Sequence, residues 1–159
     1  MSLLGVDSLP CYNIAMGAAA AVYDPRYLAG ILFFNRREFF EAHEVWEDLW
    51  SEATGPDHRF YQGLIQAAVA LHHFGNGNVR GAAKLYVSSR AYMESFGSPY
   101  LGLDNAGFWR QMEQCFAELM AAEQPDRSVE LDVDLAPTIT LDPPPESWPD
   151  PADFVEIEE

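Results

Sequence analysis

Basic residues are scarce in this 159-residue chain, which has nine lysines and arginines against 25 aspartates and glutamates. Lysine occurs once, at Lys84, and the formal net charge is −16 at pH 7. A protein of this charge is repelled by phosphate backbones, and the sequence has no cluster of basic residues to overcome the repulsion. We therefore expect no binding to nucleic acid.

The negative charge is spread unevenly along the chain. Residues 1–122 contain 13 acidic and 8 basic residues, whereas residues 123–159 contain 12 acidic residues and a single base, Arg127. An acidic, lysine-poor surface is typical of proteins in concentrated salt, because ions screen the repulsion between carboxylates. A halophilic source is one interpretation of this composition, and an acidic tail on a mildly charged body is the other.

Cysteines and long apolar runs are also scarce. Cys11 and Cys115 lack the short spacing of a metal-binding or redox pair, and we expect both to be reduced thiols in the cytoplasm. The apolar run at residues 14–22 is too short to span a membrane, and no basic residue precedes it as in a signal peptide. The sequence therefore predicts a cytoplasmic protein without membrane association.

The first 123 residues show no strand-like alternation, and their apolar residues recur every three or four positions instead. This spacing predicts helices over residues 25–35, 37–52, 58–75, 79–96 and 105–122. Pro25 after Asp24 marks the first helix start, and Asp57 is the expected cap of the third helix. The third helix is apolar around most of its circumference and should be central. The predicted fold is all-α, a compact bundle of about five helices built from two helical hairpins.

Three segments are expected along the chain. Residues 1–23 form an N-terminal extension, residues 24–123 the helical domain, and residues 124–159 an extended, acidic, proline-rich C-terminal arm. The composition of the arm is typical of disorder. However, residues 129–135 (VELDVDL) alternate apolar and acidic side chains, which is the period of a strand with one buried face. This alternation favours an arm that lies across its own body or across a partner subunit.

A weak internal repeat appears when Asn35 is aligned with Asn78, a shift of 43 residues. Each copy is then a helix opened by asparagine. Two stacked hairpins resemble a two-unit tetratricopeptide-like solenoid, although at least three units are usually needed for a stable array. A compact bundle is the favoured interpretation.

The stretch FFEAHEVWEDLW, residues 39–50, places one histidine among four carboxylates and two tryptophans. At about 100° per residue, the apolar face of this helix is centred near Ala42 and Leu49. Carboxylates and imidazoles three or four positions apart on a helix can share a divalent metal ion. The candidate metal ligands are Glu41, His43, Glu44, Glu47 and His73.

The remaining residues of such a site are expected on the third helix. There Gln62, Gln66 and His73 fall on one stripe bordered by Arg59, while His72 points about 100° away toward the apolar side. Buried amides need hydrogen-bond partners, which carboxylates on the second helix would supply. We expect a polar pocket between the second and third helices. Its lining residues are Glu41, His43, Glu44, Trp46, Arg59, Gln62, Gln66 and His73.

No complete catalytic motif accompanies this cluster. In HEVWE, Glu47 stands where the zinc-protease motif HExxH requires a second histidine. The sequence also lacks GxSxG and a phosphate-binding glycine loop. Three interpretations stay open: a catalytic or metal site, a ligand pocket without chemistry, and a hydrogen-bond network that docks two helices. No residue is assigned a catalytic role.

Residues 34–50 (FNRREFFEAHEVWEDLW) and 59–86 (RFYQGLIQAAVALHHFGNGNVRGAAKLY) resemble the family catalogued as domain of unknown function 309. The resemblance covers roughly residues 27–96 and implies a small helical bundle with no established activity. Arg36 or Arg37 stands where members often have glycine, which implies an altered turn into the second helix. The family's signature positions fall on Glu41, His43, Glu44, Trp46, Glu47, Gln62, Gly63, Gln66, His73, Asn78 and Gly81.

Two functions follow from these patterns. The first is binding of a small-molecule ligand or divalent ion in the polar pocket. The alternative is a helical scaffold for protein partners or for a homodimer, without catalysis. A binding site predicts polar side chains around a cavity, whereas a scaffold predicts an exposed apolar groove or patch.

Overall fold

The computed structural model describes residues 22–155, which fold into five α-helices and one short 3₁₀-helix, with no strand in this range. The all-α prediction is confirmed. No helix in this part of the chain combines the length and the apolar character needed to cross a membrane. The helices are α1 (Pro25–Asn35), α2 (Phe39–Glu52), α3 (Gly55–Gly75), α4 (Val79–Met93), α5 (Asn105–Ala121) and η1 (Pro151–Phe154).

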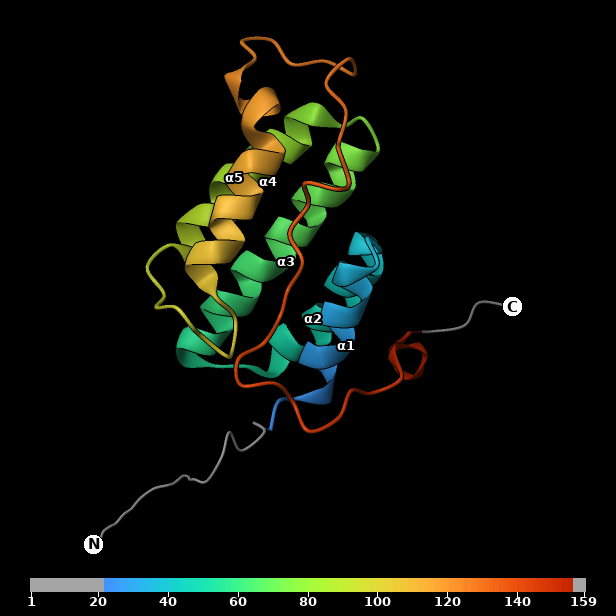
Figure 1. Cartoon of the computed structure of the whole chain (residues 1–159), viewed down its shortest axis with the longest axis vertical. Helices are drawn as coiled ribbons and strands as arrows, with labels where there is room; N and C mark the ends of the chain where they lie inside the picture. Colours follow the sequence, from blue (N-terminus) through green and yellow to red (C-terminus); the bar gives the residue numbers. More distant parts are fainter. Residues whose placement is uncertain (1–21, 156–159) are drawn as a thin grey trace, which may run out of the picture.

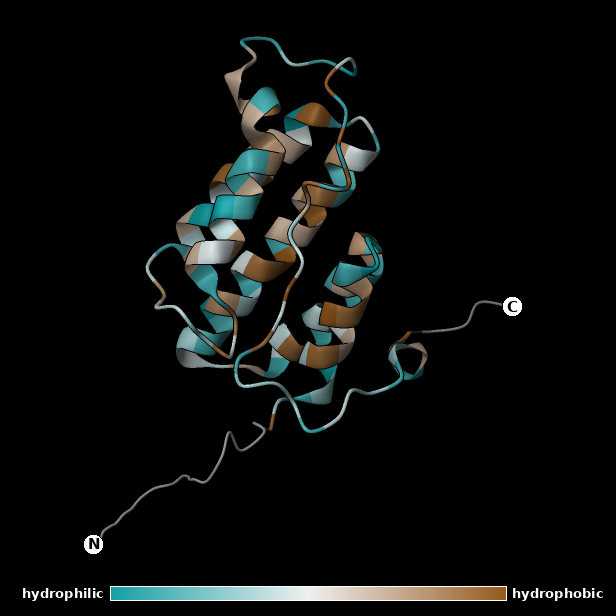
Figure 2. Ribbon diagram, viewed as in Figure 1, coloured by the Kyte–Doolittle hydropathy of each residue, from teal (hydrophilic) through white to brown (hydrophobic). Residues whose placement is uncertain are grey.

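Two antiparallel hairpins, α1–α2 and α3–α4, form the body of the fold (Figure 1). Helix α3 packs against both α2 and α4, and α5 packs on α4. The hydropathy colouring shows apolar segments on each of these helices (Figure 2). Residues Phe60, Leu64, Ala67 and Leu71 of α3 are fully buried, so α3 is the central helix, as its composition predicts.

The two hairpin turns have the same backbone geometry. Arg37 and Gly77 both adopt left-handed conformations, with φ of 68° and 80°. The next amide in each turn bonds back five residues, from Glu38 to Phe33 at 2.9 Å and from Asn78 to His73 at 2.8 Å. This is the Schellman ending of a helix. The structural repeat therefore has a shift of 40 residues, and the predicted shift of 43 is wrong.

In each hairpin, a large side chain of the second helix packs directly on a glycine of the first helix. A Cβ atom on Gly30 would lie 2.0 Å from the indole nitrogen of Trp46, and one on Gly63 would lie 2.3 Å from Cγ of Met93. Trp46 is fully buried and donates from Nε1 to the carbonyl of Tyr27 at 3.2 Å. The missing side chain at each glycine allows this close packing.

Two helix boundaries differ from the prediction. Helix α3 begins at Gly55, so Asp57 lies in its first turn and accepts a hydrogen bond from the Tyr100 hydroxyl instead of capping the helix. Helix α4 ends at Met93 and not at Phe96. The side-chain amide of Asn105 on α5 donates to the main-chain carbonyls of Met93 and Phe96, at 2.8 and 3.1 Å. These carbonyls at the end of α4 thereby gain hydrogen-bond partners.

The arm, residues 124–155 in the described range, runs lengthwise over the body between the α1–α2 hairpin and α5 (Figure 1). The strand expected at residues 129–135 is wrong, because main-chain hydrogen bonds form turns at Asp126–Val129 and Asp132–Leu135. The Asp126 and Asp132 carboxylates accept from amides two residues later, which favours turns. The buried residues of the arm are Val129, Ala136, Pro137, Ile139 and Leu141.

Candidate functional site

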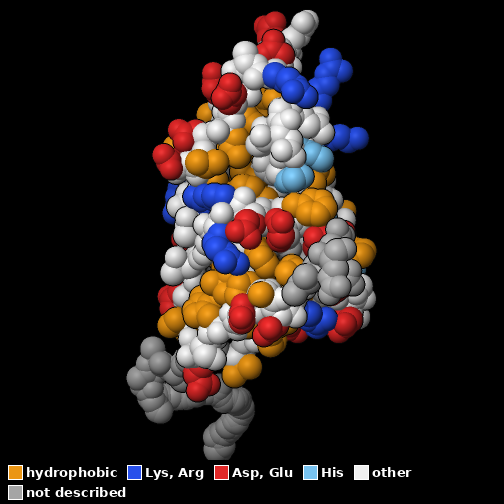
Figure 3. Space-filling model, turned by 90° about the vertical axis from the view of Figure 1, so that its right-hand side faces the viewer, with side chains coloured by type: hydrophobic (Ala, Val, Ile, Leu, Met, Phe, Trp, Pro, Cys, Tyr) orange, Lys and Arg blue, Asp and Glu red, His pale blue; other side chains and the backbone are white. Residues whose placement is uncertain are grey.

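The outer flank of α2 forms one wall of a groove of about 710 Å³. The opposite wall comes from Phe154 and Val155 at the end of the arm. The groove therefore lies between α2 and the arm, and the expected pocket between α2 and α3 is misplaced. Figure 3 shows acidic and hydrophobic side chains side by side near the histidines on one face of the molecule. The α2 residues that line the groove are Phe40, Glu41, Glu44, Glu47 and Asp48.

The carboxylates of this groove have little compensation from positive charge. Within residues 22–155 no ion pair involves Glu41, Glu44 or Asp48, and the one basic group near Glu47 is the imidazole of His43, at 3.8 Å. The chain outside this range contains no lysine or arginine. The groove is therefore a site of concentrated negative charge.

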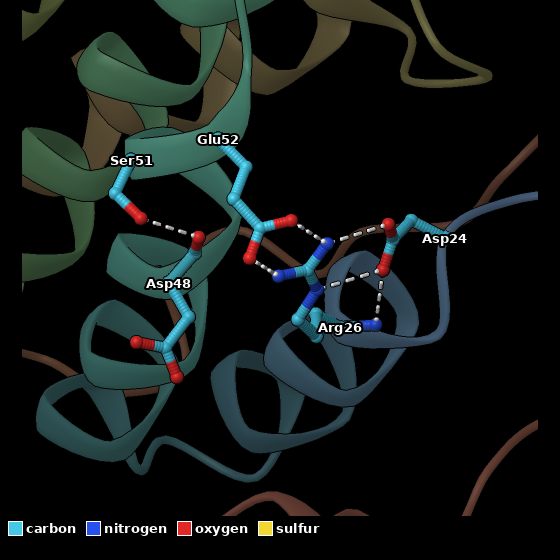
Figure 4. A network of polar contacts seen from close by, with 5 residues as sticks. All are labelled: Asp24, Arg26, Asp48, Ser51 and Glu52. Atoms are coloured by element: carbon cyan, nitrogen blue, oxygen red, sulfur yellow. Dashed lines mark hydrogen bonds and ion pairs between the residues drawn. The ribbon is translucent and has the colours of Figure 1, made fainter.

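Helix α2 is fixed by an ion-pair network at its C-terminal end (Figure 4). Arg26 of α1 bonds to Glu52 of α2 at 2.8 Å and to Asp24 at 3.1 Å. The hydrogen bonds from Arg26 lower the pKa of both carboxyls below their ordinary values. Figure 4 shows the Asp48 carboxylate pointing away from this network. The arginine orients α2 without neutralising the groove.

His43 lies at the edge of the groove. Its Nδ1–H donates to the carbonyl of Phe40 at 2.5 Å, since a carbonyl can only accept. The two rings are edge to face with centroids 4.7 Å apart. Nε2 faces Glu47 at 3.8 Å. His43 thus lies near the Glu47 carboxylate, but its imidazole packs on Phe40 and is not among the residues that line the groove.

On α3, the histidine that meets α2 is His72, and the assignment of this role to His73 is wrong. The His72 ring lies 5.1 Å from Phe40 and 6.0 Å from His73, measured between centroids. Burial, followed by the nearby His73 and His43, lowers the pKa of His72. His58 precedes His72 by fourteen residues, about four helical turns, and so lies on the same face of α3. Its ring stacks on that of Trp50 of α2, with centroids 4.6 Å apart.

The predicted polar stripe of α3 faces α4 instead of α2. Gln66 accepts a hydrogen bond from Ser88 of α4 at 2.5 Å, and Arg59 lies 4.6 Å from the ring centre of Tyr92, also on α4. Gln62 falls on the same face by its spacing. Sequence reasoning missed Ser88 because a serine in a helix gives no signal of its partner.

The remaining candidates do not assemble into a metal centre or a nucleophilic site. Trp46 is a core residue under α1. No group of three His, Cys, Asp or Glu side chains within residues 22–155 could hold a metal ion, the candidate ligands on α2 and α3 included. Cys115 is a buried free thiol, and burial raises its pKa to about 11, which keeps it unreactive. Cys11 lies outside the described residues.

The second wall of the groove also escaped sequence reasoning. Phe154 and Val155 follow a proline-rich acidic segment, and the apolar pair was a usable signal for a segment that returns to the body. Helix η1 contacts α1, which places this pair beside the α1–α2 hairpin.

Residues 27–85, from α1 to the middle of α4, match the family described as Domain of unknown function (DUF309). The resemblance read from the sequence is thereby confirmed. The DUF309 segment contains the α2 wall of the groove, whereas α5 and the arm lie beyond it.

Two proteins with similar sequences have names that assign no activity. The uncharacterized protein YpuF of Bacillus subtilis (strain 168) is 29% identical over 102 residues, which are 62% of this chain and 59% of YpuF. An uncharacterized protein of Aquifex aeolicus (strain VF5) is 31% identical over 72 residues, 45% of this chain and 22% of that protein. The chain thus spans less than two thirds of either relative.

A crystal structure of a conserved hypothetical protein from Thermus thermophilus is similar in sequence, with 29% identity. The match covers 58% of this chain and 93% of that one, with a TM-score of 0.45.

Proposed function

We propose that the protein binds an organic cation, a ligand bearing amine or guanidinium groups, in the groove between α2 and the arm. The observation that carries this proposal is the set of four carboxylates without lysine or arginine partners beside an exposed aromatic ring. Phe40 is 44% exposed and stands next to these carboxylates in the groove lining.

The chemistry of the groove suits such a ligand in two ways. Carboxylates form charge-assisted hydrogen bonds to ammonium and guanidinium groups, and an aromatic face attracts a cation within about 6 Å. The volume of about 710 Å³ falls in the range of small-molecule sites. Phe154 and Val155 offer an apolar surface for the methylene chain of a polyamine, lysine or arginine.

Binding is better supported than catalysis or metal coordination. Among the described residues the groove lining contains no serine, cysteine or histidine, so it lacks a hydroxyl or thiol nucleophile and an imidazole base. A divalent ion has weaker support, because the described residues form no three-ligand group.

The scaffold alternative also has weaker support. The exposed large apolar residues are distributed over α2, α4, α5 and the arm, examples being Phe40, Val87, Met120 and Val133. A basic segment of a partner protein nevertheless presents the same chemistry as a free polyamine, so the test distinguishes these two sources.

Calorimetric titration with spermidine and, separately, with a short Lys/Arg peptide tests the proposal. The double variant Glu44→Gln/Glu47→Gln should bind the effective cation at least about tenfold more weakly, because hydrogen bonds between charged groups contribute about 1.5–3 kcal/mol. Glu118→Gln/Glu123→Gln removes the same charge from exposed positions elsewhere and should retain affinity. Equal weakening in both variants, or no binding of either cation, would refute a specific site.

A further inference from the structure

The arm is held to the body by side chains that bind its main chain. Asn35, the last residue of α1, donates from Nδ2 to the carbonyl of Ile139 at 2.9 Å and accepts from the amide of Ile139 at 2.8 Å. One side chain thus pairs with both main-chain groups of one arm residue, as a neighbouring strand would.

The adjoining arm residues are bound in the same way. Arg37 donates from its two terminal nitrogens to the carbonyls of Ala136 and Pro137, at 2.8 and 2.7 Å. Gln111 of α5 accepts from the amide of Thr138 at 3.3 Å. Every residue from 136 to 139 therefore has a main-chain group bound to a side chain of the body.

Side chains of residues 138–141 in the arm alternate between exposed threonines and buried apolar residues. Ile139 and Leu141 are 3% and 4% exposed and belong to the core, whereas the alternating residues Thr138 and Thr140 are exposed. Leu141 also pairs with Leu103 in an isolated antiparallel bridge. Main-chain hydrogen bonds with pockets for alternate side chains are how receptors bind extended peptides.

The conformation of Arg37 is consistent with a role in holding a peptide. A left-handed φ disfavours any residue with a Cβ atom, and the equivalent turn uses Gly77 at this position. The turn alone therefore favours glycine. The guanidinium of Arg37 supplies what glycine lacks, two hydrogen bonds to an extended chain.

We propose that Asn35, Arg37 and Gln111 form a receptor site for an extended segment of a partner protein, and that the arm is its intramolecular ligand. Because the contacts are to the main chain, the site accepts any extended segment with apolar residues two positions apart, as Ile139 and Leu141 are. A tethered segment has a high effective concentration, so the docked arm masks the site until it is displaced.

Fluorescence anisotropy tests this proposal on the full chain, with a labelled peptide of residues 135–142 (LAPTITLD) as the probe. Ile139→Asp/Leu141→Asp should release the arm and bind the probe at least about tenfold more tightly than the wild type. Thr138→Asp/Thr140→Asp adds the same charge at exposed positions and should bind the probe as weakly as the wild type. Adding Asn35→Ala to the first variant should remove the binding.

A second experiment covers the case in which the double variant loses its fold. A protease site inserted within residues 124–128 allows the wild-type arm to be cut while it stays docked, and the labelled peptide is then added. Exchange of the peptide for the cut arm, prevented by Asn35→Ala, supports the receptor site. Absence of exchange, or binding that ignores Asn35→Ala, would overturn it.

Discussion

The α1–α2 and α3–α4 hairpins reach one backbone geometry through different residues. In the α3–α4 turn Gly77 adopts the left-handed φ, and the Asn78 side chain caps α4 by accepting from the amide of Gly81. In the α1–α2 turn Arg37 adopts the same conformation, and Glu38 gives α2 no side-chain cap. The α3–α4 turn is stabilised by local preferences. The α1–α2 turn depends on contacts with the arm.

The arm contacts offset what the α1–α2 turn lacks locally. Arg37 and the adjacent Asn35 bind residues 136–139, about a hundred positions away in the sequence. The comparison teaches that a residue poorly suited to its turn can mark a tertiary contact. Here the contact lies on the surface between the α1–α2 hairpin and α5, over which the arm runs.

The largest expected loss of stability comes from substituting the glycines on which Trp46 and Met93 pack. Gly30→Ala should lower the free energy of unfolding by about 3 kcal/mol, because the rigid indole of Trp46 and its hydrogen bond leave no room for a Cβ atom. Gly63→Ala should cost less, about 1–2 kcal/mol, because Cγ of the buried Met93 and Cβ of Tyr92 must shift but a methionine adapts more readily than an indole. Urea unfolding measures both, and equal losses would contradict this ranking.

An intermediate effect is expected from exchanging the turn residues. Gly77→Ala should destabilise the protein by about 1 kcal/mol, since alanine resists the left-handed conformation. Arg37→Gly should leave the free energy of unfolding within about 1 kcal/mol of the wild type, because relief of strain offsets two lost hydrogen bonds. The same variant should make the arm more sensitive to limited proteolysis. If proteases cut the arm of Arg37→Gly no faster than the wild-type arm, the arginine does not hold the arm.

The smallest expected effect is acid sensitivity at the open ends of the hairpins. Arg26 joins α1 to α2 through carboxylates whose pKa values it lowers, so this stabilisation is present above about pH 4 and lost as pH falls through the lowered pKa values. Arg59 joins α3 to α4 through the Tyr92 ring, a contact that involves no carboxylate. The stability difference between wild type and Arg26→Gln should therefore shrink from pH 6 to pH 3. The stability difference between wild type and Arg59→Gln should stay constant over the same pH range. If both differences changed with pH in the same way, acid sensitivity would not distinguish the two hairpins.

Much of the fold was predictable from local patterns. Apolar residues at helical spacing identify all five helices, and Pro25 after Asp24 marks the start of α1 within the correct turn. These signals suffice because each helix buries one face, and the apolar residues of that face recur every three or four positions within the helix itself. The end of α4 was less predictable, because Asn105 from another helix determines it.

The candidate site was less predictable because it depends on how helices are rotated against one another. The four carboxylates of α2 lie together along the groove, whereas the polar stripe of α3 was assigned to the wrong neighbour. Gln66 could find a partner on either side by its chemistry, and only the packing of Met93 on Gly63 turns this face toward α4. For the arm wall of the groove, the apolar residues Phe154 and Val155 signal a return to the body, but the helix that they meet is far away in the sequence and could not be predicted.

Hydrogen exchange at the Ile139 amide is the measurement that tests the comparison of the two turns most directly. Asn35→Ala removes the side chain that accepts from this amide, whereas Asn78→Ala removes an asparagine with a purely local role in the other turn. The comparison predicts much faster exchange at Ile139 in Asn35→Ala and wild-type exchange in Asn78→Ala. Equal exchange rates at Ile139 in all three proteins would contradict it.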